Sequence, residues 1–222
     1  DCICIADVET HASSRILKGY RPLFDASVIE RVKQEGAIII GKTLQDEFGF
    51  GGFATNVGLG FDVPLHPLDK ERATGGSSGG SGGISRMADF PHVSLAESTG
   101  GSIASPASLC GVYGLCPTYG RVPRYGLLDY GNSLDKIGPM SDDVEAMALV
   151  MEVISGYEER DSTSLDAAVP VYSSSAVDIK NIRVGVVTES FAEGLQEPVR
   201  KAVLDFAETL KAKGAIVKDV NV

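Results

Sequence analysis

Short, mainly apolar segments at three places in the first half of the chain predict buried strands. They cover residues 1–8, 37–40 and 92–96, and the middle one reads Ala-Ile-Ile-Ile. Continuous runs of this kind are typical of strands in a sheet that is covered on both faces. The pattern therefore predicts an α/β core.

A helix with well-marked ends is predicted over residues 25–35. Asp25 is a good N-cap, Ser27 and Glu30 have the spacing of a capping box, and Gly36 is expected to end the helix.

Three further helices are predicted between residues 14 and 154. One is short, at 14–17, and one follows a glycine-rich run, at 79–87, where glycine lowers helix propensity. The third has Ser141 as its N-cap and four apolar residues on one face, Val144, Met147, Met151 and Ile154.

The end of the chain predicts a strand–helix–strand unit. A strand over 182–187 is followed by a helix that Pro198 opens at its first position, and Gly214 ends that helix before a strand over 215–222. The helix is expected to turn four residues inward, Val199, Val203, Phe206 and Leu210.

Two segments are predicted to be irregular. Glycine and proline interrupt every period from 49 to 69, which indicates a long loop. Residues 156–178, rich in serine, aspartate and proline, are expected to form a surface crossover rather than a domain boundary. The prediction is a single partial domain over 1–222.

Composition limits the possible partners. The chain has 222 residues, 43% of them apolar, which is enough to bury a core, and it has no run of about 18 apolar residues that could span a membrane. Its formal charge of −10 disfavours a direct grip on a polyanion such as a nucleic acid. It lacks an initiator methionine, so we expect a piece of a longer protein. Four cysteines fit no zinc spacing, and a reducing cytoplasm is expected.

Two glycine–serine segments carry the candidate chemistry. Residues 75–83 read Gly-Gly-Ser-Ser-Gly-Gly-Ser-Gly-Gly, and residues 97–103 read Glu-Ser-Thr-Gly-Gly-Ser-Ile. A glycine–serine run alone is typical of a flexible linker, but this pattern returns after a predicted buried strand, which a linker does not need. Glycines beside a serine let several backbone N–H groups point at one place, as in an oxyanion hole. A simple tight turn stays open as the alternative.

These segments resemble those of the amidase signature family, whose members use a serine nucleophile, a bridging serine and a lysine. The resemblance implies that Ser102 is the nucleophile, that Ser77 is the bridging serine and that Ser78 supports them. It also implies an oxyanion hole made by the backbone N–H groups of Thr99, Gly100 and Gly101. A serine needs a neighbouring base, and the three histidines, at 11, 66 and 92, lie in unrelated contexts.

Further motifs narrow the resemblance. Residues 117–127 contain Pro-Thr-Tyr-Gly-Arg-Val and Arg-Tyr-Gly-Leu, and residues 132–140 read Asn-Ser-Leu-Asp-Lys-Ile-Gly-Pro-Met. With Glu97-Ser98-Thr99, they are similar to the A subunits of glutamyl-tRNA(Gln) amidotransferases in an archaeal-like form. That resemblance implies an amidase-signature-like mixed β-sheet core flanked by helices, incomplete at both ends, and a glutaminase activity that generates ammonia.

The same resemblance implies partners. Glutamine is the expected substrate, and its ammonia is expected to pass to the B subunit of the amidotransferase, with a small C subunit as a further candidate partner. The B subunit is expected to use ATP and magnesium and to hold Glu-tRNA(Gln). No cofactor, metal or membrane contact is expected for this chain itself.

The family's lysine is expected immediately before Asp1, because Asp1 and Cys2 stand where the family has a Lys-Asp-Asn turn. Lys42 is the alternative base within the chain. A structural role suits it better, with Asp46 or Glu47 as its partner or with its ammonium group in solvent.

Three functions stay open. The first is the glutaminase subunit of a tRNA-dependent amidotransferase that works through a serine acyl-enzyme. The second is a stand-alone amidase that acts on small amides. The third is a folded remnant without catalytic activity.

Overall fold

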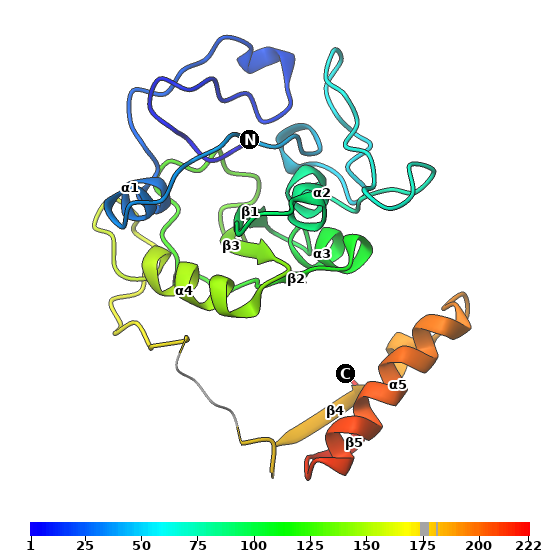
Figure 1. Ribbon diagram of the computed structural model, residues 1–222. Helices are drawn as coiled ribbons and strands as arrows, with labels where there is room; N and C mark the ends of the chain where they lie inside the picture. Colours follow the sequence, from blue (N-terminus) through cyan, green and yellow to red (C-terminus); the bar gives the residue numbers. More distant parts are fainter. Residues whose placement is uncertain (174–177, 181) are drawn as a thin grey trace. The chain divides into compact units, whose positions relative to one another are not determined.

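The computed structural model describes residues 1–173, 178–180 and 182–222 (Figure 1). They divide into two units, Asp1–Ser173 and Ser174–Val222, and each unit has its own sheet. The division falls inside the predicted surface crossover, whose residues 174–177 lie outside the described part. The single domain over 1–222 stays a prediction.

The first unit combines an antiparallel sheet with short helices, so the predicted α/β class is confirmed. Its strands pair in the order β1 (Ser94–Ser98), β3 (Lys136–Ser141), β2 (Tyr113–Gly114). Its helices are α1 (Ser27–Gln34), α2 (Gly79–Met87), α3 (Ala104–Cys110) and α4 (Val144–Ile154), with 3₁₀ helices at Arg15–Leu17 and Glu47–Gly49. The helix at 79–87 and the short helix near 14–17 are confirmed, and the strand predicted at 92–96 begins two residues later.

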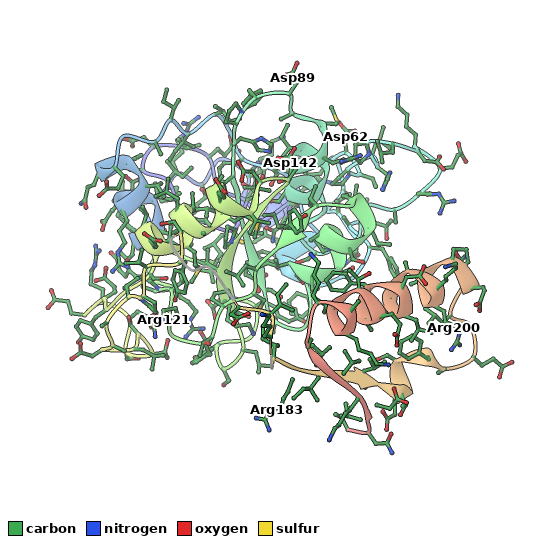
Figure 2. The ribbon with its side chains drawn as sticks, turned by 60° about the horizontal axis from the view of Figure 1, so that its bottom comes forward. Asp62, Asp89, Arg121, Asp142, Arg183 and Arg200 are labelled. Carbon is green, nitrogen blue, oxygen red and sulfur yellow. The ribbon has the colours of Figure 1, made fainter. Side chains whose placement is uncertain are left out.

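Acidic side chains lie on the outside of the first unit. Asp62, Asp89 and Asp142, which are labelled in Figure 2, are exposed. Exposed carboxylates repel a polyanion. That this chain does not hold tRNA directly stays a prediction.

Residues 1–8, predicted to be a strand, form only an isolated bridge between Ile3 and Leu127. The neighbours of Ile3 exchange two backbone hydrogen bonds, of 2.8 and 2.9 Å, with the neighbours of Leu127. Residues 2–5 are buried as expected. The pairing ends there because Asp7 has a φ of 59°, a left-handed conformation that no strand contains.

Residues 37–40, also predicted to be a strand, belong to no strand in the described part of the chain. Ile38 and Ile40 are 86% and 67% exposed. Strand propensity measures how well a side chain fits a paired, half-buried surface, so a β-branched run without a hydrogen-bonded neighbour stays irregular.

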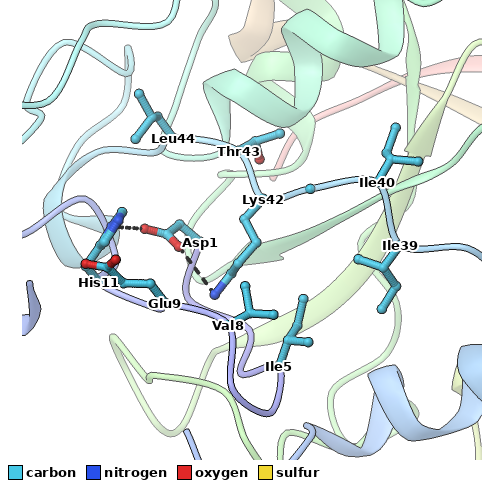
Figure 3. Close-up of a pocket in the computed structure, with 11 residues that line it drawn as sticks. Asp1, Ile5, Val8, Glu9, His11, Ile39, Ile40, Lys42, Thr43 and Leu44 are labelled. Carbon is cyan, nitrogen blue, oxygen red and sulfur yellow. Dashed lines mark ion pairs between the residues drawn. The ribbon is translucent and has the colours of Figure 1, made fainter. Parts of the chain in front are cut away.

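Lys42 follows this segment and lines a pocket with Asp1 and His11 (Figure 3). Its ammonium group lies 3.3 Å from Asp1 Oδ1 and donates a hydrogen bond to the Thr10 hydroxyl. Burial lowers the pKa of Lys42 to about 8. The structural role is supported, but the predicted partners Asp46 and Glu47 are wrong.

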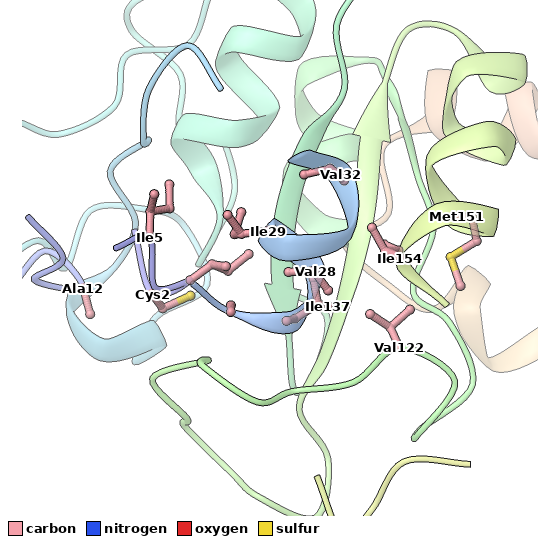
Figure 4. Close-up of a cluster of buried hydrophobic side chains, with 12 residues drawn as sticks. Cys2, Ile5, Ala12, Val28, Ile29, Val32, Val122, Ile137, Met151 and Ile154 are labelled. Carbon is pink, nitrogen blue, oxygen red and sulfur yellow. The ribbon is translucent and has the colours of Figure 1, made fainter. Parts of the chain in front are cut away.

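The main hydrophobic core of the first unit lies between α1, α4 and the N-terminal segment (Figure 4). Its buried residues are Cys2, Ile3, Ile5, Ala12, Ala26, Val28, Ile29, Val32, Val122, Ile137, Met151 and Ile154. Burying a side chain the size of valine or isoleucine contributes about 1.5–3 kcal/mol, so the three that α1 supplies hold this short helix in place.

A second cluster lies beneath the glycine–serine segments. Ala96 on β1, Met140 on β3 and Ala107 on α3 pack with Ile103, which is fully buried. Because Ile103 is next to Ser102, this cluster holds the candidate nucleophile at the junction of the sheet and α3.

The predicted cap of α1 is wrong. The Asp25 carboxylate accepts the Ala6 N–H at 2.8 Å and pairs with Lys33, and no side chain caps the helix. Gly36, with a φ of 84°, ends the helical segment as predicted.

The predicted capping box is also absent, because Ser27 and Glu30 bind the loop after α4. The Ser27 hydroxyl donates to Glu158 at 2.7 Å. Arg160 donates to Glu158 at 2.7 Å and to Glu30 at 2.6 Å. The two residues join α1 to this loop instead of capping it.

Substituting Glu158 with glutamine is expected to lower the free energy of unfolding at neutral pH, and to lower it less at about pH 3. The hydrogen bond from Arg160 lowers the pKa of Glu158 to about 2, below the unfolded value of about 4.3. The stabilisation is therefore present above about pH 4.3 and is lost as the pH falls towards about 2. Because Arg160 is 37% exposed and screened by solvent, we expect about 1 kcal/mol or less.

Chemical denaturation of the wild type and Glu158→Gln at about pH 7 and about pH 3 measures this difference. The exposed Glu71→Gln is the matched control. A destabilisation of the same size at both values would contradict the assignment.

The N-cap of α4 is Asp143, so the prediction of Ser141 is wrong. The Asp143 carboxylate accepts the N–H groups of Glu145 and Ala146 at 2.8 and 3.2 Å, whereas Ser141 ends β3. Of the predicted inward face, Met147, Met151 and Ile154 are buried and Val144 is exposed.

The second unit has the predicted strand–helix–strand order. It contains β4 (Arg183–Val187), a 3₁₀ helix (Thr188–Phe191), α5 (Glu197–Ala212) and β5 (Ile216–Val220). The strands are parallel, with Arg183 opposite Ile216. Pro198 is the second rather than the first residue of α5, and Gly214, with a φ of 102°, follows the helix as predicted.

The predicted inward face of α5 is wrong. Val199, Val203 and Phe206 are exposed, Leu210 is half-buried, and Ala207 is the buried residue of the helix. Two strands form a surface too narrow to cover one whole face of a 16-residue helix.

Candidate active site at two serine segments

Ser102 lies at the end of the turn that follows β1. Ser98, the last residue of β1, is buried, and its Oγ accepts the Gly101 N–H at 3.2 Å. Gly101 has a φ of 137°, which favours glycine, and its carbonyl accepts the Ser105 N–H at 2.8 Å. This turn holds Ser102 with only 9% of its surface exposed.

The glycine-rich segment before α2 is packed against other backbone. A Cβ on Gly75 would lie 2.9 Å from the backbone of Pro106 in α3, and a Cβ on Gly76 would lie 2.5 Å from the Ala54 nitrogen. Such contacts are too close for any side chain. The glycines therefore have a packing role that a flexible linker does not have.

The structure brings the two serine segments together. The Ser78 N–H donates to the Ser102 carbonyl at 3.4 Å, and the Ser78 hydroxyl donates to the Glu97 carbonyl at 3.0 Å. Ser77 is 1% exposed, and its Oγ has no hydrogen-bond partner within the described residues. A buried hydroxyl without a partner costs about 1–3 kcal/mol, so this one is suited to a bond made during a reaction.

One of the three predicted oxyanion donors is already engaged, because the Gly101 N–H points to Ser98 Oγ. Gly100 is exposed, and a Cβ on it would meet no atom within 4 Å, so its backbone borders open space. Thr99 and Gly100 stay the predicted donors.

Sequence reasoning missed two carboxyl groups beside this turn. Thr99 Oγ1 lies 2.9 Å from Glu97 Oε1 and 2.5 Å from Asp135 Oδ1. Glu97 is 4% exposed and Asp135 is fully buried. They meet because β1 and β3 are antiparallel, with Ser98 opposite Lys136. Glu97 directly follows the strand predicted at 92–96, but no strand was predicted beside Asp135, so the sequence alone carried no signal for this pair.

The described residues show neither a metal site nor a membrane-spanning helix. Within them, no group of three or more His, Cys, Asp or Glu side chains could hold a metal ion, and none of their helices is long and apolar enough to cross a membrane. The four cysteines are all free thiols.

Sequence comparison relates the whole chain to known amidotransferase subunits. The family model described as Amidase matches residues 1–222. The A subunit of the glutamyl-tRNA(Gln) amidotransferase of Methanococcoides burtonii is 48% identical over 205 residues, which cover 92% of this chain and 42% of that protein. The protein of the same name from Chloroflexus aurantiacus is 44% identical over all 222 residues and 45% of its own length.

Solved structures of related proteins have the same fold as this chain. The crystal structure of the A subunit of the glutamyl-tRNA(Gln) amidotransferase from Thermotoga maritima superposes with a TM-score of 0.93 at 37% identity, over 99% of this chain and 48% of that one. Native peptide amidase from Stenotrophomonas maltophilia gives a TM-score of 0.86 at 30% identity, over 99% and 46%. The chain thus spans less than half the length of each of these relatives. From the match along its whole length, the chain belongs to the Amidase family.

Proposed function

We propose that this chain is the central part of the glutaminase subunit of a tRNA-dependent amidotransferase, which converts Glu-tRNA(Gln) to Gln-tRNA(Gln). The observation that carries the proposal is the bond from Ser78 to the Ser102 carbonyl beside the buried, unpartnered Ser77 hydroxyl. Relatives named as amidotransferase A subunits, at 42 to 48% identity, support the choice of reaction.

In this proposal Ser102 Oγ attacks the side-chain amide carbon of glutamine. The serine proton passes through Ser77 to a lysine, which then protonates the leaving ammonia. The negative oxygen of the tetrahedral intermediate is stabilised by the N–H groups of Thr99 and Gly100. Water then attacks the glutamyl ester on Ser102, which releases glutamate and restores the serine.

The base and the partners lie outside this chain. The lysine is expected immediately before Asp1. ATP and magnesium act at the B subunit, which activates the glutamate on the tRNA, holds that tRNA and receives the ammonia, and the small C subunit is a further partner. The reaction is expected in the cytoplasm.

The function is tested by assaying the complete protein on glutamine and on simple aliphatic amides, with and without the B subunit. We expect the B subunit to raise glutamine hydrolysis by about ten-fold, because coupling between two sites is typically a few kcal/mol or less. Simple amides are expected to be slow in both conditions. The exposed Asp89→Ala is expected to behave as the wild type.

Strong turnover of simple amides without a partner would overturn the proposal in favour of a stand-alone amidase. The likeness to native peptide amidase is the observation that favours this second candidate. The higher identity to the amidotransferase A subunits favours the first.

A further inference from the structure

Thr99 has one hydroxyl proton but two carboxyl neighbours. Its Oγ1 is within hydrogen-bond distance of both Glu97 Oε1 and Asp135 Oδ1. A threonine hydroxyl donates one hydrogen bond and accepts up to two. If both carboxyl groups were ionised, one of these contacts would set two oxygen lone pairs against each other. One of the two carboxyl groups therefore carries a proton.

The hydrogen bonds identify Asp135 as the ionised partner. Its oxygens accept the Tyr130 N–H at 2.8 Å and the Gly131 N–H at 2.9 and 3.0 Å. Several backbone N–H groups directed at a carboxyl favour its charged form. Among the described residues, Thr99 is the one side chain bonded to the Glu97 carboxyl, so Glu97 is the group that holds the proton.

The surroundings of Glu97 also favour its protonated form. Burial raises its pKa to about 7 against the hydrogen bond with Thr99, and the nearby Asp135 charge acts in the same direction as burial, against Lys136 and the amino group of Asp1. The Cys2 thiol is a further titratable group beside it. The Lys136 ammonium group itself donates to the Thr99 carbonyl at 3.4 Å, so it also holds the turn.

We propose that Glu97 is a positioning residue that acts as a neutral carboxylic acid. Its O–H donates to Thr99 Oγ1, the Thr99 O–H donates to the Asp135 carboxylate, and this chain of bonds fixes the turn that carries Ser102. The inference rests on the proposed function for the role of Ser102. When Glu97 ionises, the first bond is lost and a second negative charge faces Asp135, so the turn shifts.

A pH titration followed by nuclear magnetic resonance tests the inference on the full chain without requiring catalysis. In the wild type, the backbone amide signals of Thr99, Gly100 and Gly101 are expected to shift with a midpoint near pH 7 between about pH 5 and about pH 9. In Glu97→Gln, whose amide is neutral and still donates to Thr99, these shifts are expected to disappear. The exposed Glu71→Gln is the control and should titrate as the wild type.

Wild-type signals without a midpoint in that range, or a Glu97→Gln variant that titrates as the wild type, would overturn the inference. A second readout is the rate of labelling of Ser102 by a fluorophosphonate. The ratio of Glu97→Gln to wild type is expected to be about one at about pH 6 and about five-fold at about pH 8.5. In a protein that labels, a ratio that does not change with pH also overturns the inference. Labelling is compared in the complete protein, which is expected to carry the lysine before Asp1. If that protein does not label but shows the amide titration, the result supports the inference and counts against the proposed function.

Discussion

Replacing Ser102 by alanine is expected to abolish labelling by a fluorophosphonate and to lower amide hydrolysis by about 10⁴-fold or more. In the proposed mechanism this change removes the oxygen that forms the acyl bond, and the turn that is left would offer N–H donors but no nucleophile. Ser102 is 9% exposed and held by the turn after β1, so the missing hydroxyl is not replaced by a neighbouring serine. Mass spectrometry of the labelled protein and the rate of ammonia release measure the two effects.

Two further serines make this result specific. Ser77→Ala is expected to lower the rate by a similar factor and not to lower the free energy of unfolding, which should rise by up to about 1–3 kcal/mol because the buried Oγ has no partner to lose. Ser133→Ala, at an exposed position, should match the wild type in both respects. Labelling that persists in Ser102→Ala would remove Ser102 from the mechanism, and a large destabilisation in Ser77→Ala would make that residue structural.

Replacing Asp46 by alanine is expected to destabilise the first unit by about 3–5 kcal/mol. Asp46 is fully buried, and its carboxylate accepts the Ala54 N–H at 3.0 Å and the Asn56 N–H at 2.7 Å. Alanine leaves both N–H groups without an acceptor, at about 1–3 kcal/mol each. A Cβ on Gly51 or Gly76 would overlap an atom of this carboxyl group, so its removal also leaves a cavity between them.

Chemical denaturation measures the effect of this change. Asp46→Asn keeps one oxygen acceptor and is expected to fall between the wild type and Asp46→Ala. The exposed Asp89→Ala, the same substitution at the surface, should stay within about 0.5 kcal/mol of the wild type. An Asp46→Ala variant as stable as Asp89→Ala would contradict the role of this carboxylate.

The sequence predicted correctly those elements whose position depends on residues within or next to the element itself. The helix α2 was found from the residues that follow the paired serines, and the ends of α1 and α5 from Gly36 and Gly214. Glycine at such positions is needed by the backbone itself, so the signal does not depend on the rest of the fold. The meeting of the two serine segments was expected from the family resemblance and is present in the structure.

The sequence did not predict correctly those features that depend on a partner residue far away in the chain. The β-branched run at 37–40 has the composition of a strand, but a strand also needs a paired neighbour. Asp25 has the chemistry of an N-cap, yet the Ala6 N–H competes successfully for its carboxylate. Glu97 and Asp135 come together through the register of β1 and β3, which no local pattern encodes.

The second unit has consequences for how the chain unfolds. Among its described hydrophobic residues, only Ala207 and Ala215 are buried, and they lie between one helix and two parallel strands. Because it has two strands and little buried apolar area, the free energy of local unfolding of this unit is small. This part of the chain therefore belongs to a less cooperative unit than the core around α1 and α4. A single melting temperature does not describe both, and the stability changes at Asp46 and Glu158 refer to the main transition alone.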